Sequence, residues 1–195
     1  MNTFYIVRHG ETENNRAKRL SGWIDTPLTD TGLQATKKVI AKLANLYIDE
    51  VYSSDVGRAF ITAYVLARGL NFAKEIKRLS SLREVNYGDA ANMYSAEAYK
   101  LYPKLDRDTH YIPPNGESLD HMQKRVFQTI SQLNNTHTDA TIVLVCHSGV
   151  MAALRASYIG QDFGEHNISE AYPHEFVGKF TFDNDAVASF VEFVG

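Results

Sequence analysis

Runs of consecutive apolar residues, without polar alternation, occur in three places along the chain. They cover Phe4–Val7, Thr141–Val145 and, more briefly, Val51–Ser53, with many β-branched or aromatic side chains. A half-exposed strand alternates polar and apolar residues, whereas a continuous apolar run is typical of a strand buried on both faces. We therefore expect these segments to form a largely parallel central sheet that is covered by helices.

Elsewhere, apolar residues recur every three or four positions, which is the spacing of an amphipathic helix. One stripe follows Thr29 and Asp30, a capping residue and an acid, another follows Asp55, and a third opens at Asn115–Ser118. Strands that alternate with helices predict an α/β fold with three layers, α/β/α. The stripes consist of Leu33, Thr36, Ile40, Leu43 and Tyr47; of Ala59, Ala63, Leu66 and Leu70; and of Leu119, Met122, Val126, Ile130 and Leu133.

The end of the chain has a different pattern. Apolar residues, many of them Phe or Val, flank the turn-forming sequence at Asp183–Asp185. This arrangement predicts a C-terminal β-hairpin. Its outer strand would offer an unpaired edge to a second copy of the chain, so a homodimer is one expected partnership.

The composition is that of an ordinary soluble protein. The chain has 195 residues, 44% hydrophobic and 22% charged, with a net charge of −3. This length predicts one domain over residues 1–195. The absence of a basic run argues against nucleic acid as a partner, and no apolar run is long enough to span a membrane. The single cysteine, Cys146, cannot form an internal disulfide, so we expect a cytoplasmic protein.

Two of the expected strands are followed by a histidine. His9 comes after the first strand and precedes Gly10, whereas His147 comes after the last and precedes Ser148 and Gly149. In open α/β sheets, ligands bind beyond the carboxyl ends of the strands. The glycines would let the backbone approach a ligand closely, and a helix beginning near Ser148 would direct its N-terminus at an anion. We expect both histidines to lie at one ligand site.

Arg8, directly before His9, indicates phosphoryl chemistry. A neutral imidazole can attack phosphorus and form a phosphohistidine, while guanidinium groups hold the charged oxygens. Arg58 is a candidate for a second guanidinium group at a strand-to-helix junction. The departing oxygen needs a proton, and Glu84 is one candidate donor, which spacing alone does not distinguish from the rest of the 23 acidic residues.

Metal-binding patterns are missing from the sequence. The seven histidines and one cysteine are scattered, without the short spacings that ligate zinc. No glycine-rich phosphate loop or dinucleotide fingerprint occurs. We expect neither a metal site nor a cofactor, and Cys146 is expected to be a buried structural thiol.

Short motifs follow one another in order along most of the chain, from residue 4 to about residue 150. They are Arg8–Glu13; Gly22–Thr29 with Gly32, Gln34 and Ala35; Tyr52–Asp55 with Arg58, Ala59, Thr62 and Ala63; Leu82–Glu84 with Tyr87 and Gly88; Pro114–Ser118; and His147–Gly149. This ordered series resembles the phosphatase branch of the histidine phosphatase superfamily. The resemblance implies a phosphoglycerate mutase-like fold and metal-independent chemistry.

The resemblance also implies a role for each matching residue. His9 would be the nucleophile that becomes phosphorylated. Glu84 would donate a proton to the leaving oxygen and then act as the base for water. Arg8, Arg58 and His147 would surround the phosphoryl group. Positions that hold phosphate or substrate in relatives are matched by Asn15, Ser21, Gly22 and Tyr87.

The chain departs from the family pattern in two places. Asp89–Asn92, which includes Ala90 and Ala91, replaces a Trp-Glu-Gly-like stretch that lines the substrate entrance in relatives. Phosphoglycerate mutases of the family also bind a second negative group with a Lys and an Arg pair. This chain has Ser95 at the matching Lys position, and only Lys104 and Arg107 lie near the missing pair. Water is therefore the expected phosphoryl acceptor.

The sequence is compatible with three functions. The favoured one is a metal-independent phosphomonoesterase that acts through phosphohistidine on a small cytosolic phosphate ester. The second is a cofactor-dependent phosphoglycerate mutase, stimulated by 2,3-bisphosphoglycerate. The third is a non-catalytic module that binds a phosphorylated ligand, and the presence of both His9 and Glu84 argues against it.

The segment from about residue 90 to 113 is expected to form a cap over the site. Its aromatic residues would pack the cap onto the domain rather than hold a ligand. Tyr172–Glu175, before the hairpin, is expected at the rim of the site, and the sequence assigns no role to His174. The aromatic residues in question are Tyr94, Tyr99, Tyr102 and Tyr111.

Overall fold

The computed structural model describes residues 1–105, 107–160 and 172–195. In this part of the chain, six strands form one sheet with the order β3-β2-β4-β1-β5-β6. The pairs β1–β4, β2–β4 and β2–β3 are parallel, whereas β1–β5 and β5–β6 are antiparallel. The strands are β1 Thr3–Arg8, β2 Glu50–Ser54, β3 Lys77–Leu79, β4 Thr141–Cys146, β5 Val177–Asp183 and β6 Ala186–Glu192. The expected α/β fold is confirmed, with a mixed sheet.

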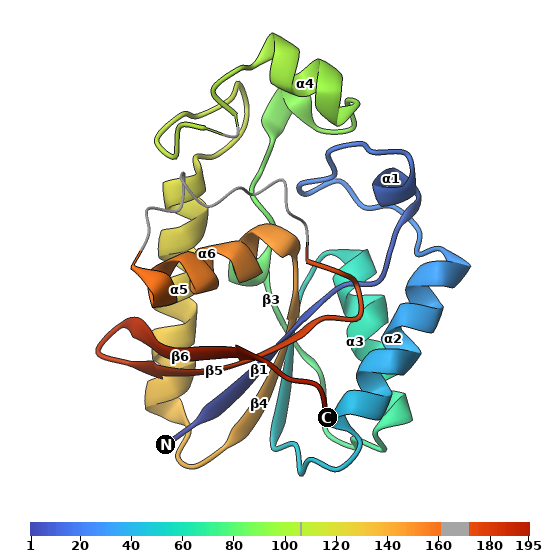
Figure 1. Ribbon diagram of the computed structural model, residues 1–195, viewed down its shortest axis with the longest axis vertical. Coiled ribbons are helices and arrows are strands. Elements are labelled where there is room, and N and C mark those ends of the chain that lie inside the picture. The colour runs from blue at the N-terminus through green and yellow to red at the C-terminus, as the bar shows by residue number, and fades with distance from the viewer. Residues whose placement is uncertain (106, 161–171) are drawn as a thin grey trace.

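Helices cover both faces of this sheet (Figure 1). Tyr5 and Val7 of β1 pack in a cluster with residues of α2 (Asp30–Leu43) and α3 (Gly57–Gly69). The alternate residues of β1, Phe4 and Ile6, pack in a second cluster with α5 (Leu119–Thr136) and α6 (Ser148–Ile159). Because side chains alternate across a strand, the continuous apolar run of β1 supplies both cores. Shorter helices are α1 (Glu13–Arg16), α4 (Ser95–Leu101) and the single turns η1 (Ser80–Leu82) and η2 (Gly88–Ala90).

The helical stripes were predicted with unequal success. Every residue of the α5 stripe is buried, and Ser118 caps this helix by accepting a hydrogen bond from the His121 N–H. Thr29 caps α2 as predicted, but Tyr47 lies beyond the end of that helix and is 80% exposed. The stripe that follows Asp55 lies in α3, which begins after Val56, and Asp55 itself forms an ion pair with Arg83.

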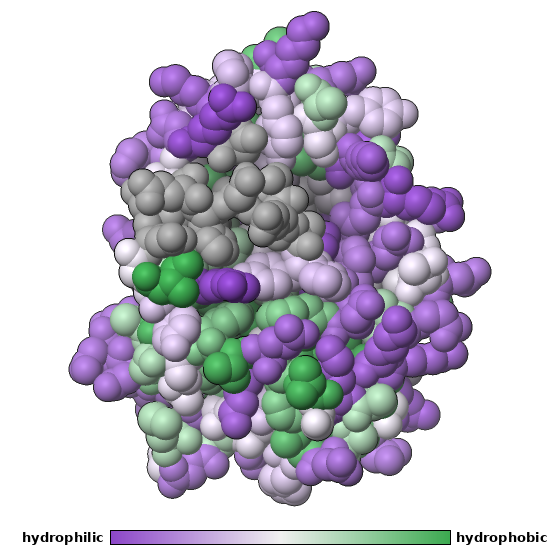
Figure 2. All heavy atoms as spheres, viewed as in Figure 1, coloured by the Kyte–Doolittle hydropathy of each residue, from purple (hydrophilic) through white to green (hydrophobic). Residues whose placement is uncertain are grey.

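The C-terminal hairpin is present as β5 and β6. The two residues between these strands, Asn184 and Asp185, have φ values of 47° and 59°. Positive φ at both positions is the geometry of a tight hairpin turn, which Asn and Asp tolerate. Figure 2 shows hydrophobic side chains gathered over the lower central face, where β5 and β6 lie in Figure 1. The homodimer expected through this hairpin stays a prediction.

The expected cap segment holds α4 and lies above the carboxyl ends of the strands in Figure 1. Its own small core joins Ala90, Ala98 and Leu105 to Leu20, with partly buried Tyr99, Tyr102 and Tyr111 against it. These tyrosines pack as predicted. Tyr94 differs: it is 45% exposed and lies under the guanidinium of Arg19. Among the described residues, no helix has the length and apolar character needed to cross a bilayer.

Candidate active site

The carboxyl ends of two neighbouring strands bring the predicted histidines together. β1 ends at Arg8 and β4 ends at Cys146, and the His9 N–H donates to the Cys146 carbonyl at 2.9 Å. The ring centroids of His9 and His147 lie 5.2 Å apart. Parallel pairing of β1 with β4 therefore places both side chains at one edge of the sheet. Cys146 is fully buried, as predicted.

Hydrogen bonds select one tautomer of His9. Its Nδ1 lies 2.8 Å from the Gly10 carbonyl oxygen, which can only accept, so Nδ1 carries the proton. Nε2 then holds a lone pair, and the Arg58 Nε–H donates to it at 3.1 Å. Burial lowers the pKa of His9 well below 6.5, and the nearby Arg58, His147 and Arg8 lower it further. The imidazole is therefore neutral and nucleophilic at ordinary pH.

Arg58, in the first turn of α3, is almost completely buried, with 1% of its surface exposed. Besides His9, its guanidinium donates to the carbonyls of Gly22 at 2.7 Å and Ile24 at 2.8 Å. A further Nη2–H points at Nδ1 of His147, 3.2 Å away. Burial lowers the pKa of Arg58 from its usual range. The group remains a cation, fixed in one orientation by its partners.

His147 is completely buried and does not lie on the cavity wall, because it sits behind Arg58. Its Nδ1 accepts from Arg58, so Nε2 carries the proton and donates to the Ser54 hydroxyl at 2.9 Å. Burial, and then the charge of Arg58, lowers the pKa of His147 well below 6.5. In this structure His147 thus contacts the side chains that face the cavity, rather than facing it directly.

Arg8 lines the cavity and carries one donor that is unsatisfied among the described residues. It is 8% exposed, and its Nη1 donates to the Tyr172 carbonyl at 2.5 Å. Its Nε, however, is buried without a hydrogen-bond partner in the described residues. Burial lowers the pKa of Arg8 to about 10, so it stays charged. A buried, charged and unsatisfied donor is costly.

Glu84 reaches the same cavity from the segment after η1. One carboxylate oxygen accepts from the Gly149 N–H and the other from the Val85 N–H, both at 3.0 Å. Gly149 lies in the first turn of α6, and a Cβ added there would stand 2.2 Å from Glu84 Oε1. Glycine at this position therefore lets the carboxylate approach the start of the helix.

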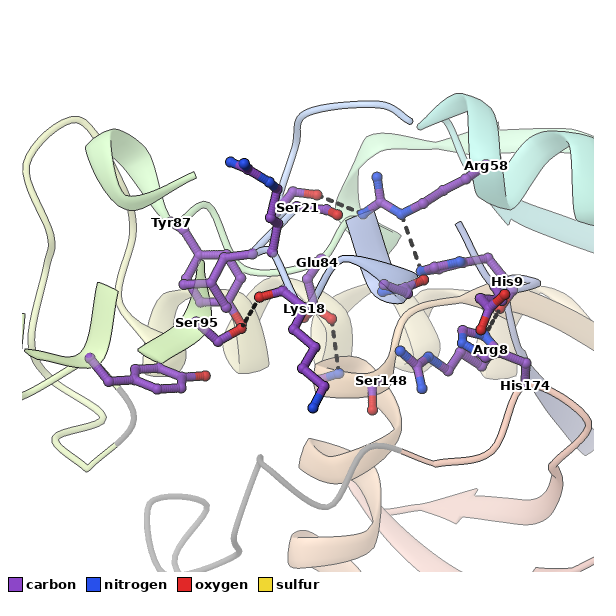
Figure 3. Close-up of a pocket in the computed structure, with 17 residues that line it drawn as sticks. Arg8, His9, Lys18, Ser21, Arg58, Glu84, Tyr87, Ser95, Ser148 and His174 are labelled. Carbon is purple, nitrogen blue, oxygen red and sulfur yellow. Dashed lines mark hydrogen bonds between the residues drawn. The ribbon is translucent and has the colours of Figure 1, made fainter. Parts of the chain in front are cut away.

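These side chains surround a cavity of about 540 Å³. Figure 3 shows Arg8, His9, Arg58 and Glu84 converging on it from different elements. The wall also contains all the residues matched to substrate-binding positions: Asn15, Ser21, Gly22 and Tyr87.

The matched substrate-binding residues differ in what they offer. The Ser21 hydroxyl is buried and lacks a hydrogen-bond partner among the described residues. Asn15 is engaged in a capping box with Thr12 at the start of α1. Gly22 has φ +51°, a conformation that favours glycine, and its carbonyl holds Arg58.

Several wall residues were not predicted as site residues. Lys18 and Arg19 come from the loop after α1, Ser95 and Tyr99 come from α4, and Glu11 follows β1. Lys18 has a left-handed backbone with φ 55°, and its carbonyl accepts from the Ser95 N–H at 2.9 Å and hydroxyl at 3.0 Å. The two adjacent cations before Ser21 were the available sequence signal.

His174 belongs to the segment expected at the rim of the site, and it lines the cavity wall. Its Nδ1 donates to the His9 carbonyl at 2.6 Å, and its ring centroid lies 5.8 Å from that of His9. Burial and the charge of Arg8 lower the pKa of His174 to about 4, so it is neutral at ordinary pH. No sequence motif marks this residue, since only the fold brings it to His9.

A metal ion would need several ligating side chains close together. In residues 1–105, 107–160 and 172–195, no three His, Cys, Asp or Glu side chains lie close enough together to hold a metal ion. The groups on the cavity wall include histidines, guanidinium groups and carboxylates.

Comparison with known proteins gives consistent results. Phosphoglycerate mutase-like protein 4 of Arabidopsis thaliana is 35% identical, over 76% of this chain and 67% of that protein. The metal-independent phosphoserine phosphatase of Arabidopsis thaliana is 32% identical, over 76% of this chain and 65% of that protein. The chain thus spans about two thirds of the length of these relatives.

The solved structure of Bacillus stearothermophilus YhfR superposes with a TM-score of 0.83 and 26% identity, over 96% of this chain and 94% of that one. The profile of the histidine phosphatase superfamily (branch 1) matches residues 4–186. The expected fold class and enzyme type, a phosphatase of this kind, are confirmed. With this match over nearly its whole length, the chain belongs to the histidine phosphatase superfamily, branch 1.

Proposed function

We propose that this protein is a metal-independent phosphomonoesterase that forms a phosphohistidine on His9. The observation that carries the proposal is the state of His9: neutral, with Nδ1 protonated by its bond to Gly10 and the Nε2 lone pair directed at Arg58. Such an imidazole can attack phosphorus without first losing a proton. Arg8 and Arg58 supply fixed positive charge around the reacting group.

The first step transfers the phosphoryl group to the enzyme. A phosphoryl oxygen takes over the Arg58 Nε–H that His9 accepts in the free site, which releases the Nε2 lone pair. Nε2 forms a bond to phosphorus while the bond from phosphorus to the ester oxygen breaks. Glu84, in its protonated form, gives its proton to that oxygen, so the alcohol leaves neutral.

The second step returns the enzyme to its starting state. Glu84, now a carboxylate, takes a proton from water as the water oxygen bonds to phosphorus. The bond from phosphorus to His9 Nε2 breaks, and its electron pair stays on the nitrogen. Inorganic phosphate leaves, with His9 neutral and Glu84 protonated again, so protons and charges balance over the cycle.

We propose that the substrate carries a second negative group besides its phosphate. Figure 3 shows Lys18 directed into the open part of the cavity, and its ammonium has no ion-pair partner in the described part of the chain. Arg19, by contrast, is already engaged with the Asn92 carbonyl and the ring of Tyr94. The relative named as a phosphoserine phosphatase supports this idea, because phosphoserine carries a carboxylate.

The mutase alternative gains one argument from Lys18. The sequence offered no cation for a second negative group near Ser95, whereas the fold brings Lys18 beside that residue. A mutase would be stimulated by 2,3-bisphosphoglycerate and would transfer the phosphoryl group faster than it releases phosphate. We favour hydrolysis because a single open cation holds a bisphosphorylated cofactor poorly.

The decisive experiment measures phosphate release from an aryl phosphate in excess chelator. We expect turnover by the wild type, none by His9→Ala, and normal turnover by His121→Ala, which removes an exposed histidine from α5. A rapid-quench experiment should trap a phosphoenzyme that is labile to acid, as a phosphoramidate is. Turnover that survives His9→Ala would refute the mechanism, and wild-type binding of phosphate without turnover would favour the non-catalytic module.

A further inference from the structure

Arg125 of α5 lies behind Glu84 and holds the main chain around it. Its guanidinium donates to three carbonyl oxygens: Ser81 at 2.8 Å, Arg83 at 2.7 Å and Glu84 at 2.8 Å. The Arg125 side chain is 20% exposed. It shares a helix face with Met122, three residues earlier, which is buried. The Arg125 side chain thus binds three of the four carbonyls from Ser81 to Glu84.

The segment that carries Glu84 needs such a partner. Residues 83–87 belong to no helix or strand, so their carbonyls are not satisfied by a regular ladder. Buried backbone carbonyls without partners are destabilising, and a planar guanidinium with several donors can satisfy more than one. The Trp23 indole N–H adds a second donor to the Glu84 carbonyl, at 2.8 Å.

Glu117 extends this support to the other side of Glu84. Its carboxylate accepts from Arg125 at 2.6 and 3.2 Å. The oxygen with the shorter bond also accepts from the Asn86 N–H at 2.9 Å, and the Glu117 N–H donates to the Asn86 carbonyl at 3.0 Å. The Arg125–Glu117 pair therefore fixes the backbone both before and after the proposed acid.

We propose that Arg125 is a positioning residue for proton transfer by Glu84, an inference that rests on the function proposed above. Arg125 does not line the cavity, so it acts through the main chain rather than through the substrate. With the Glu84 carbonyl held by Arg125 and its carboxylate held by Gly149, the side chain spans two fixed points. Loss of the first point lets the carboxyl group drift from the leaving oxygen.

Leaving groups of different basicity separate this role from a purely structural one. Acidic phenols leave without much help from a proton, whereas alkoxides need a proton from a general acid. A displaced Glu84 therefore slows alkyl phosphates more than aryl phosphates. A partly unfolded preparation slows both equally, since only the concentration of active enzyme changes.

The test compares kcat/KM for an alkyl phosphate with that for an acidic aryl phosphate on the same preparation. In Arg125→Met, we expect the alkyl-to-aryl ratio to fall by roughly 100-fold, the loss associated with misplacing a catalytic group by about 1 Å. Glu84→Gln should lower the ratio at least as far. Trp23→Phe, which removes only the second donor to the Glu84 carbonyl, should lower it less.

The matched control is Lys124→Met, which removes an exposed cation from the neighbouring position of α5 and should leave the ratio unchanged. If Arg125→Met does not fold, Arg125→Lys provides the same comparison, because an ammonium cannot reach all three carbonyls. Equal losses for both esters, or an unchanged ratio, in a folded Arg125 variant would overturn the inference. An unchanged ratio in Glu84→Gln would instead overturn the proposed role of Glu84, and this inference with it.

Discussion

The two ends of the cavity are built differently. At the inner end, His9 and Arg58, with His147 behind them, are between 0% and 4% exposed, and their polar atoms bind one another, the backbone or the Ser54 hydroxyl. At the outer end, Lys18 is exposed and the Ser95 hydroxyl donates to the Lys18 carbonyl. The inner end is therefore organised before any ligand arrives, whereas the outer end keeps freedom to adapt.

This difference indicates where catalysis and selectivity reside. Groups that stabilise charge in a transition state are most effective when their orientation is fixed in advance. The Arg58 guanidinium meets this condition through its bonds to Gly22 and Ile24, two carbonyls of the loop that precedes α2. The outer cations can only distinguish substrates by their long-range attraction, which water and salt weaken.

The largest effect is expected at Arg58. Arg58→Ala should lower kcat/KM by roughly 10²- to 10³-fold, because a preorganised donor to the phosphoryl oxygens is lost. The matched control is Arg68→Ala, which removes an exposed arginine from the last turn of the same helix. Steady-state kinetics on both variants measures kcat/KM, and thermal melts verify that they are folded. Near-normal kinetics in Arg58→Ala would show that the inner end does not depend on its most buried cation.

The inner end was also the more predictable one. The apolar runs of β1 and β4 identified the strands, and the residue after each strand identified His9 and His147. Arg58 and Glu84 could be selected only by family resemblance, because many arginines and acids have similar local sequences. Local sequence contains the position of a strand end, but not which distant segment lies beside it.

The outer end depends on contacts that no local pattern records. Lys18 faces the cavity because a left-handed backbone and two bonds from Ser95 turn its loop toward α4. At the inner end, His174 likewise escapes local pattern analysis, because it reaches His9 from a segment 165 positions away. β3, only three residues long with two exposed, likewise lacked the apolar run that reveals a buried strand.

Acid should weaken the inner end first. Burial lowers the folded-state pKa of His9 and His147 well below 6.5, and that of His174 to about 4. Below pH 6.5 the unfolded chain therefore binds more protons than the folded one. The stabilisation of the folded state by these neutral histidines is complete above pH 6.5 and is lost as the pH falls toward 4.

Urea unfolding across that pH range measures this loss. His174→Gln, which can still donate to the His9 carbonyl, should reduce the pH dependence of the unfolding free energy, whereas the exposed His121→Gln should not. The hydrogen bond from Arg83 lowers the pKa of Asp55, so carboxylates of this kind also contribute to the pH dependence of stability at low pH. The histidine contribution is accordingly the difference between variant and wild type. Identical curves for His174→Gln and wild type would contradict it.

The smallest effect is expected at the outer end, at Lys18. Lys18→Glu should lower kcat/KM by roughly tenfold for esters with a second negative group, relative to uncharged esters, because attraction becomes repulsion across a partly solvated gap. Added salt should shrink this ratio, since exposed charges are screened. Lys100→Glu makes the same charge change on α4 without lining the cavity, so it should leave the ratio unchanged. If Lys18→Glu changes the ratio no more than Lys100→Glu does, Lys18 does not select the substrate and the outer end distinguishes esters by shape alone.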